Sequence, residues 1–237
     1  MSDLRVETRG AARWLTMDRP GQRNALTLDL VRALTAALQD LDEVTAVVIT
    51  GAGPVFCPGA DNSLAEEVKA GGAEAAAATI YGPLHGLVRA VRDADVPVLA
   101  ALNGPALGGG FDLALACDLR IAVAGAWLQS SWVTYGLVPG MGGAYAAERL
   151  VGSARASELL LLGERVPADQ ALAWGLLNAV TDDLDQAVTG IVDRLAALPR
   201  QGVVANKRVL RRLRDAGLEA ELARLGDEQA ALLTNRP

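Results

Sequence analysis

Two short apolar segments, each followed by a turn rich in glycine and proline, place the strongest constraint on how this chain folds. Residues 44–50 and 97–102 are almost entirely apolar apart from two threonines, with many β-branched or small side chains. A continuous apolar run predicts a strand covered on both faces, as in a parallel sheet between helices. Leucines at every fourth position from Leu26 to Leu38 predict one such helix, near residues 27–40.

The same order of strand, turn and helix continues along the chain, which is mostly helical in pattern from residue 154 onward. Further strands are predicted over residues 4–8, 12–17 and 119–123, and further helices over residues 64–72, 73–94, 111–117 and 203–225. This order predicts an α/β fold. No linker rich in Pro or Ser separates two independent domains.

The composition excludes several classes of protein. With 51% hydrophobic and 21% charged residues among 237, the chain is neither disordered nor fibrous. A net charge of −6 and 4% aromatic residues argue against nucleic-acid binding. One His and two Cys leave too few ligands for a structural zinc site. We expect a cytoplasmic protein with no membrane-spanning segment or secretory signal, and with Cys57 and Cys117 unpaired.

Two glycine-containing turns offer main-chain hydrogen-bond donors. Residues 108–110 are three glycines that follow a predicted strand and open a predicted helix. Unpaired N–H groups at a helix start carry partial positive charge and can bind a developing oxyanion, and glycine lets a ligand carbonyl approach the backbone. Gly59 and Ala60 can supply a second N–H from another strand end. The alternative is that both segments are only tight turns.

Three motifs resemble those of the crotonase, or enoyl-CoA hydratase/isomerase, superfamily. They are FCPGAD at residues 56–61, PVLAALNGPALGGGFDLALACD at residues 97–118 and GLVPGMGG at residues 136–143. The resemblance implies a spiral of ββα units over residues 1–185 and a helical oligomerisation region over residues 186–237, in a homotrimer or homohexamer. It also implies an acyl-CoA thioester substrate, as in fatty acid metabolism, with no metal and no cofactor beyond the CoA of the substrate.

The resemblance also implies roles for particular residues. Ala60 and Gly109 match the two positions whose N–H groups form the family's oxyanion hole. The basic stretch over residues 207–214 is a further candidate for contact with the CoA phosphates. Residues expected to contact CoA are Arg23, Ala25 and Asp61.

The two catalytic positions of the family's hydratases differ in this chain. Those enzymes use two glutamates, whereas this chain has Asp112 at the first position and Trp132 at the second. Hydration needs one group to deprotonate water and another to handle the α-proton, and an indole N–H can only donate. Moving one proton between carbons needs a single base. We therefore expect isomerase-type chemistry with Asp112 as the base and Trp132 in the wall of the acyl pocket.

Other features are similar to the 4-chlorobenzoyl-CoA dehalogenases. His85 and Trp132 match a His and a Trp of those enzymes, but Gly140 stands where they carry the nucleophilic Asp. His85 is therefore a second candidate base, and Gly140 is expected in the acyl pocket. Two alternatives stay open: an acyl-CoA hydrolase or dehalogenase-like enzyme that uses Asp112 or His85, and a non-catalytic acyl-CoA-binding subunit.

Overall fold

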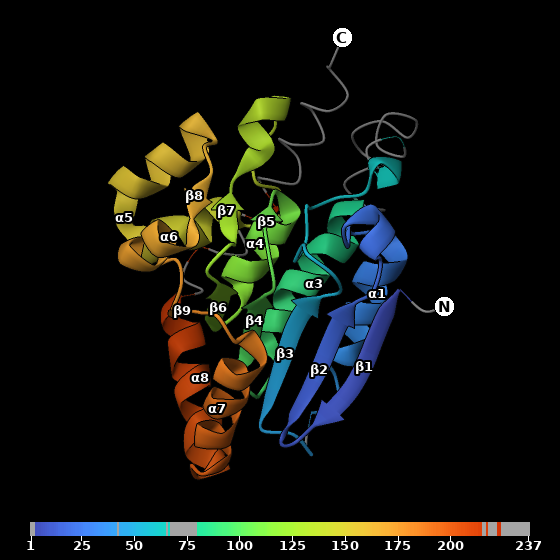
Figure 1. Ribbon diagram of the computed structural model, residues 1–237, viewed down its shortest axis with the longest axis vertical. Coiled ribbons are helices and arrows are strands. Elements are labelled where there is room, and N and C mark those ends of the chain that lie inside the picture. The colour runs from blue at the N-terminus through green and yellow to red at the C-terminus, as the bar shows by residue number, and fades with distance from the viewer. Residues whose placement is uncertain are drawn as a thin grey trace.

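A twisted, mostly parallel sheet forms the centre of the molecule (Figure 1). The computed structural model describes residues 3–41, 43–64, 66, 80–214, 217, 222 and 223. In this part the sheet has six strands in the order β1-β2-β3-β4-β6-β9. They are β1 (Leu4–Arg9), β2 (Ala12–Met17), β3 (Ala46–Gly51), β4 (Val98–Leu102), β6 (Leu119–Val123) and β9 (Ala179–Thr181). β1 and β2 form the predicted antiparallel hairpin, and every later pair is parallel.

Helices cover both faces of this sheet, which explains why the central strands are continuously apolar. Alternate residues of a strand enter two different cores. Ile49 of β3 belongs to the larger core, whereas Val48 of β3 and Leu99 of β4 pack with Val188 and Val192. The larger core includes side chains of α1 (Leu28–Ala37), α3 (Gly82–Asp93) and α4 (Gly109–Ala116), and the smaller core includes α7 (Leu184–Ala196). The predicted α/β class is confirmed.

A second, three-stranded sheet continues from the carboxyl end of β4. It consists of β5 (Ala106–Leu107), β7 (Trp127–Gln129) and β8 (Val166–Pro167), with β5 parallel and β8 antiparallel to β7. Further helical elements in the described part of the chain are η1 (Pro20–Gln22), η3 (Ser131–Tyr135), α5 (Gly143–Leu162), α6 (Ala168–Trp174) and α8 (Arg200–Arg214). None of the helices in the described residues is both long and apolar enough to cross a bilayer.

The sequence-based boundaries differ from the structure at two short strands. β8 and β9 lie in the stretch predicted as mostly helical, because strands of two or three residues leave no periodic signal. The division of the chain expected after residue 185 stays a prediction, and residue 185 lies in the first turn of α7, which packs on the sheet. Three predicted helical segments lie wholly or mostly outside the described residues. They are the helix over residues 64–72, the first part of the helix over residues 73–94 and the end of the helix over residues 203–225.

A buried ion pair attaches α8 to the amino end of the sheet. The ammonium of Lys207 lies 2.7 Å from Asp118 Oδ2 and donates to the carbonyls of Val96 and Val91 at 2.8 and 3.3 Å. Burial lowers the pKa of Lys207, and the charge of Asp118 opposes that shift. Asp118 also accepts the N–H of Val98 at 2.8 Å. Lys207 therefore uses its ammonium group to hold α8 against the sheet.

Candidate active site

The two glycine-containing turns are in backbone contact. The Leu107 N–H donates to the carbonyl of Cys57 at 3.0 Å. A Cβ on Gly59 would lie 2.7 Å from the Gly109 nitrogen, and one on Gly110 would lie 2.1 Å from the Cys57 oxygen. Gly59 also has a φ of +100°. Only glycine meets these constraints, so the glycines bring the segment before Ala60 against the start of α4.

The N–H groups of Ala60 and Gly109 are unpaired within the described part of the chain. On either side of Ala60, the Gly59 carbonyl accepts from Leu26 and the Asp61 N–H donates to Leu26, both at 2.8 Å. Gly109 is the first residue of α4, where an N–H has no partner in the helix. Both donors are therefore available to a ligand oxygen, as the predicted oxyanion hole requires.

Asp112 lies one turn of α4 after Gly109, and its side chain is almost completely buried. The residue is 1% exposed. Oδ1 accepts the indole N–H of Trp132 at 3.4 Å, Oδ2 accepts the Met141 N–H at 3.2 Å, and the Gly143 N–H donates as well. Burial raises the pKa of Asp112 to about 7, although these three hydrogen bonds favour the carboxylate. A carboxyl group with this pKa can both accept and return a proton near neutral pH.

The turn before α5 shapes the environment of Asp112. Its last residue, Gly142, has a φ of +83°, and α5 begins at Gly143. A Cβ on Gly143 would lie 1.9 Å from Asp112 Oδ1, so the carboxyl group fits only because position 143 is glycine. The amides of Met141 and Gly143 were not predicted as site groups. The sequence does carry a signal for these two donors, because residues 140–143 (GMGG) form a glycine-rich start to a helix, as residues 108–110 do.

His85 contacts this turn through one ring nitrogen, Nε2. It is buried on α3, and its Nε2 lies 2.8 Å from the carbonyl oxygen of Gly140. A carbonyl oxygen only accepts, so Nε2 carries the proton and donates it. Nε2 is therefore not available as a base in this arrangement, and a catalytic role for His85 stays a prediction. Gly140, expected in the acyl pocket, is buried and uses its carbonyl to bind His85.

Replacing His85 with Leu should lower kcat/KM about tenfold, because the buried Gly140 carbonyl would lose its donor at a cost of about 1–3 kcal/mol. His85→Gln should retain most of the activity, because its amide N–H can still donate. Steady-state kinetics with an enoyl-CoA substrate measure both variants. Equal losses above about 10²-fold in both would instead assign His85 to the chemical step.

The three residues expected at CoA occupy different environments. Arg23 is exposed, directly after η1. The Ala25 carbonyl accepts from the Arg19 guanidinium at 2.5 Å, and Asp61 pairs with Arg19 at 3.1 Å. A hydrogen bond from the Ser63 backbone, with help from Arg19, holds the pKa of Asp61 below its usual range. Of the three, Arg23 has the exposed side chain, while Ala25 and Asp61 are joined through Arg19.

The basic stretch over residues 207–214 is largely neutralised by neighbouring carboxylates. Arg208 binds Asp95 at 2.8 Å and Arg211 binds Asp93 at 3.1 Å. These pairs, with the Lys207–Asp118 pair, use much of the positive charge that was expected to meet CoA. The stretch is therefore first of all a structural contact between α8 and the segment around α3.

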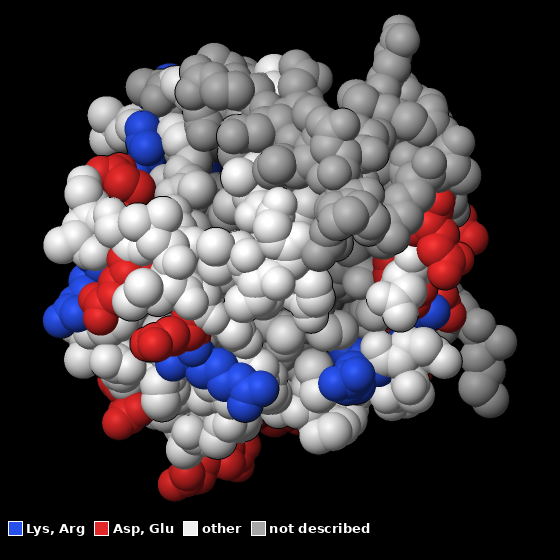
Figure 2. Space-filling model, turned by 90° about the horizontal axis from the view of Figure 1, so that it is seen from above, with Lys and Arg blue, Asp and Glu red and all other residues white. Residues whose placement is uncertain are grey.

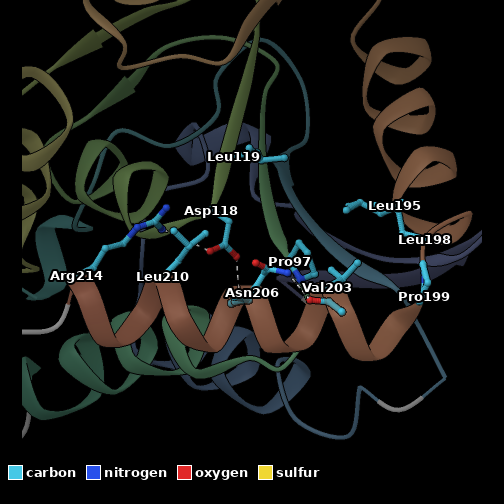
Figure 3. Close-up of a pocket in the computed structure, with 12 residues that line it drawn as sticks. Pro97, Asp118, Leu119, Leu195, Leu198, Pro199, Val203, Asn206, Leu210 and Arg214 are labelled. Carbon is cyan, nitrogen blue, oxygen red and sulfur yellow. Dashed lines mark hydrogen bonds and ion pairs between the residues drawn. The ribbon is translucent and has the colours of Figure 1, made fainter.

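The surface has a largely uncharged area and a separate pocket. In the view from above, the Lys, Arg, Asp and Glu residues that can be seen lie mostly toward the edge of the molecule, around a largely uncharged area (Figure 2). A pocket of about 450 Å³ lies between α7 and α8, beside Pro97 and Leu119 (Figure 3). Pro97 and Leu119 stand at the amino ends of β4 and β6, whereas Gly109 follows the carboxyl end of β4. This pocket is therefore at the opposite end of the sheet from Asp112.

Comparisons with known proteins address the family of this chain. The family model described as enoyl-CoA hydratase/isomerase matches residues 7–234. The chain belongs to the enoyl-CoA hydratase/isomerase family. The probable enoyl-CoA hydratase echA12 of Mycobacterium leprae is 37% identical over 205 residues, covering 83% of this chain and 70% of that protein. The 4-chlorobenzoyl coenzyme A dehalogenase-2 of Arthrobacter sp is 34% identical over 216 residues, covering 86% and 76%.

A solved structure extends the comparison to the fold. The enoyl-CoA hydratase/isomerase from Mycobacterium paratuberculosis superposes with a TM-score of 0.93 at 29% identity, covering 100% of this chain and 95% of that one. The crotonase-type fold and the resemblance to the enoyl-CoA hydratase/isomerase family are confirmed. The protein is an acyl-CoA enzyme of this family.

Proposed function

We propose that this protein shifts a carbon–carbon double bond in an enoyl-CoA thioester, with Asp112 as the group that moves the proton. The observation that supports this most strongly is the place of Asp112. Its buried carboxyl group, with a pKa of about 7, lies one helical turn after the unpaired N–H of Gly109. A general base works best when its pKa is close to the operating pH.

In the proposed reaction, the Ala60 and Gly109 N–H groups bind the thioester oxygen and make the α-proton more acidic. The Asp112 carboxylate removes that proton from a 3-enoyl thioester, and the negative charge of the resulting dienolate rests on the thioester oxygen. The carboxylic acid then gives the proton to the γ-carbon. The product is the 2-enoyl isomer, the carboxylate is restored, and no atom is gained or lost.

The second hydratase position supports isomerisation over hydration. Trp132 offers an N–H there and donates it to Asp112. An indole cannot take a proton from water, so this position supplies no base for a nucleophilic water. The N–H instead stabilises the carboxylate form of Asp112, which is the form that removes the α-proton.

The proposal also covers the contact with CoA, the oligomeric state and the location of the protein. Arg23 is the candidate contact for a CoA phosphate, because its guanidinium is exposed. We also propose a homotrimer or homohexamer in which residues 186–237 take part, and a cytoplasmic location. Sedimentation of the full chain tests the oligomeric state.

Incubation with 3-hexenoyl-CoA in D₂O tests the reaction type. We expect 2-hexenoyl-CoA, with deuterium entering the acyl chain only at exchanged α- and γ-positions, no addition of water and no free thiol. Mass spectrometry and a thiol reagent separate the outcomes. A 3-hydroxyacyl product would assign hydration, released CoA would assign hydrolysis, and tight binding without turnover would assign a non-catalytic subunit.

A further inference from the structure

The pocket between α7 and α8 is elongated and mainly apolar (Figure 3). Its lining follows one face of α8 from Val203 through Leu210 to Arg214, which spans about 16 Å along the helix. Leu198, on the opposite side, and Leu210 are 54% and 46% exposed, so apolar side chains border an open groove. Its volume of about 450 Å³ lies in the range of small-molecule sites, which are mostly apolar with a few polar groups.

A smaller, basic cleft adjoins this pocket at the Arg214 end. It shares Asp118, Lys207 and Arg214 with the pocket and adds Arg92 and Arg211 to them. At about 10 Å³ the cleft has room for about one water-sized group, such as one oxygen of a ligand's head group. Figure 3 shows Arg214 at one end of the pocket and Leu198 at the other. The apolar pocket therefore has a positively charged end.

The ion pairs of α8 leave an excess of positive charge around the basic cleft. Lys207 and Arg214 share one carboxylate, that of Asp118, at 2.7 and 3.7 Å. Arg120, two residues after Asp118, is buried and donates to main-chain carbonyls, including that of Cys117 at 2.6 Å, but forms no ion pair within the described residues. Burial lowers the pKa of Arg120, and the charge of Arg214 lowers it further. A bound anion would reduce this repulsion between cations.

Arg214 has hydrogen-bond donors that the described residues do not use. Its ion pair with Asp118 Oδ1 is 3.7 Å long, and among the described residues its guanidinium makes no hydrogen bond. A guanidinium carries five N–H donors in a planar fork that fits a carboxylate. The side chain is 41% exposed and lines both the pocket and the basic cleft. Arg214 is therefore placed to bind the head group of a molecule whose apolar part lies along α8.

We propose that the pocket and the basic cleft together bind a fatty-acid anion, with its carboxylate at Arg214 and its hydrocarbon chain between Leu198 and Leu210. The small volume of the cleft favours a carboxylate over a bulkier phosphate, and the length of the groove along α8 favours an extended chain over a ring. The pocket is at the opposite end of the sheet from Asp112. The inference therefore goes beyond the proposed reaction and does not depend on it.

Calorimetry of the full chain with decanoate, 1-decanol and butyrate tests the ligand class. Decanoate should bind about tenfold more tightly than 1-decanol, because hydrogen bonds between charged groups are stronger than those to a neutral hydroxyl. Decanoate should also bind at least about tenfold more tightly than butyrate, whose short chain leaves most of the apolar surface uncovered. Saturating butyryl-CoA should not displace decanoate, because the proposed oxyanion site is elsewhere.

Two pairs of variants test the two parts of the site. Arg214→Gln should weaken decanoate binding about tenfold and change 1-decanol binding less than about threefold. Arg212→Gln is its matched control, because Arg212 is exposed on the same helix and lines neither cavity. Leu210→Ala should weaken the binding of decanoate and 1-decanol alike, by about fivefold. Leu213→Ala should change neither, because Leu213 is 73% exposed and lies outside the pocket lining.

The other outcomes would each overturn the proposal. Absence of decanoate binding, or equal affinity for decanoate and 1-decanol, would exclude a site for a carboxylate. Equal effects of Arg214→Gln and Arg212→Gln would indicate general attraction to a basic helix. Displacement by butyryl-CoA would show that decanoate occupies the acyl-CoA site. If decanoate did not bind and Leu210→Ala changed the oligomeric state in sedimentation, the groove would be a contact between copies of the chain.

These measurements are independent of turnover, so failure of the isomerase assignment would leave the fatty-acid site intact. Conversely, loss of decanoate binding would leave the proposed role of Asp112 untouched. Melting temperatures of the four variants check that each is folded.

Discussion

Replacing Asp112 with Asn should lower kcat/KM for a 3-enoyl-CoA by about 10³-fold or more, at the upper part of the range for loss of a general acid–base group. Asn keeps the size of the side chain and one oxygen acceptor for the surrounding N–H donors. It cannot take up and return a proton. The affinity for a saturated acyl-CoA should change less than threefold, because the oxyanion donors Ala60 and Gly109 are untouched.

The matched control is Asp29→Asn, which changes an exposed carboxylate that pairs with Arg32 on α1. It should leave kcat/KM within twofold of the unsubstituted protein. Undiminished turnover in Asp112→Asn would contradict the proposed mechanism. A rise in KM alone would show that Asp112 serves binding and not proton transfer.

The pH profile provides a second measure of Asp112. Its pKa of about 7 predicts that kcat/KM falls about tenfold per pH unit below pH 7 and levels off above it, because the carboxylate is the active form. The residual kcat/KM of Asp112→Asn should not fall in this way below pH 7. A flat profile between pH 5 and 8 in the unsubstituted protein would contradict the assignment.

The same pKa shift has a consequence for stability. The pKa rises from an ordinary 3.8 to about 7 on folding, so the folded state holds the proton more tightly than the unfolded state. The contribution of Asp112 to the free energy of unfolding is therefore most favourable below pH 4 and decreases until about pH 7. The free energy of unfolding of Asp112→Asn, measured relative to that of the unsubstituted protein, should therefore increase by about 2–4 kcal/mol from pH 4 to pH 8. Urea unfolding at the two pH values measures this difference.

Local patterns predicted the parallel core but not the partners that tune the site. The continuous apolar character of β3 and β4 follows from burial on both faces, so it is visible in a short window of sequence. The donors to Asp112 come from positions 132, 141 and 143, and the partner of His85 is Gly140. These contacts depend on how α3, α4 and α5 pack together, and no periodicity in any one segment encodes that packing.

The close contact between the two glycine-containing turns left a signal in the sequence for a different reason. Glycine at positions 59 and 110 is required by close backbone contact, and such contacts leave a fixed residue type in the sequence. The partner of Lys207, in contrast, could not be predicted from the sequence. A basic stretch on a predicted helix looks the same whether it faces solvent, a phosphate or an acidic neighbour, and only the structure identifies Asp118 as its partner.

Gly110→Ala should both destabilise the protein by about 3 kcal/mol or more and lower kcat/KM by at least about 10²-fold. The new Cβ would lie 2.1 Å from the carbonyl oxygen and 2.7 Å from the Cβ of Cys57. Neither atom belongs to a flexible chain end, so α4 must move away from the segment before Ala60. That movement separates the Ala60 and Gly109 donors, and one misplaced oxyanion donor costs about 3–4 kcal/mol of the barrier.

Gly190→Ala in α7 is the matched control for this substitution. Gly190 is also a helical glycine, but a Cβ there meets no atom within 4 Å. The general preference of helices for alanine should therefore stabilise this variant by about 1 kcal/mol, with unchanged kcat/KM. Thermal unfolding and kinetics of the two variants isolate the contact at Gly110 from the effect of adding a methyl group to a helix. If Gly110→Ala kept full activity, the two donors would not need the close approach of these turns, and the oxyanion site would have to lie elsewhere.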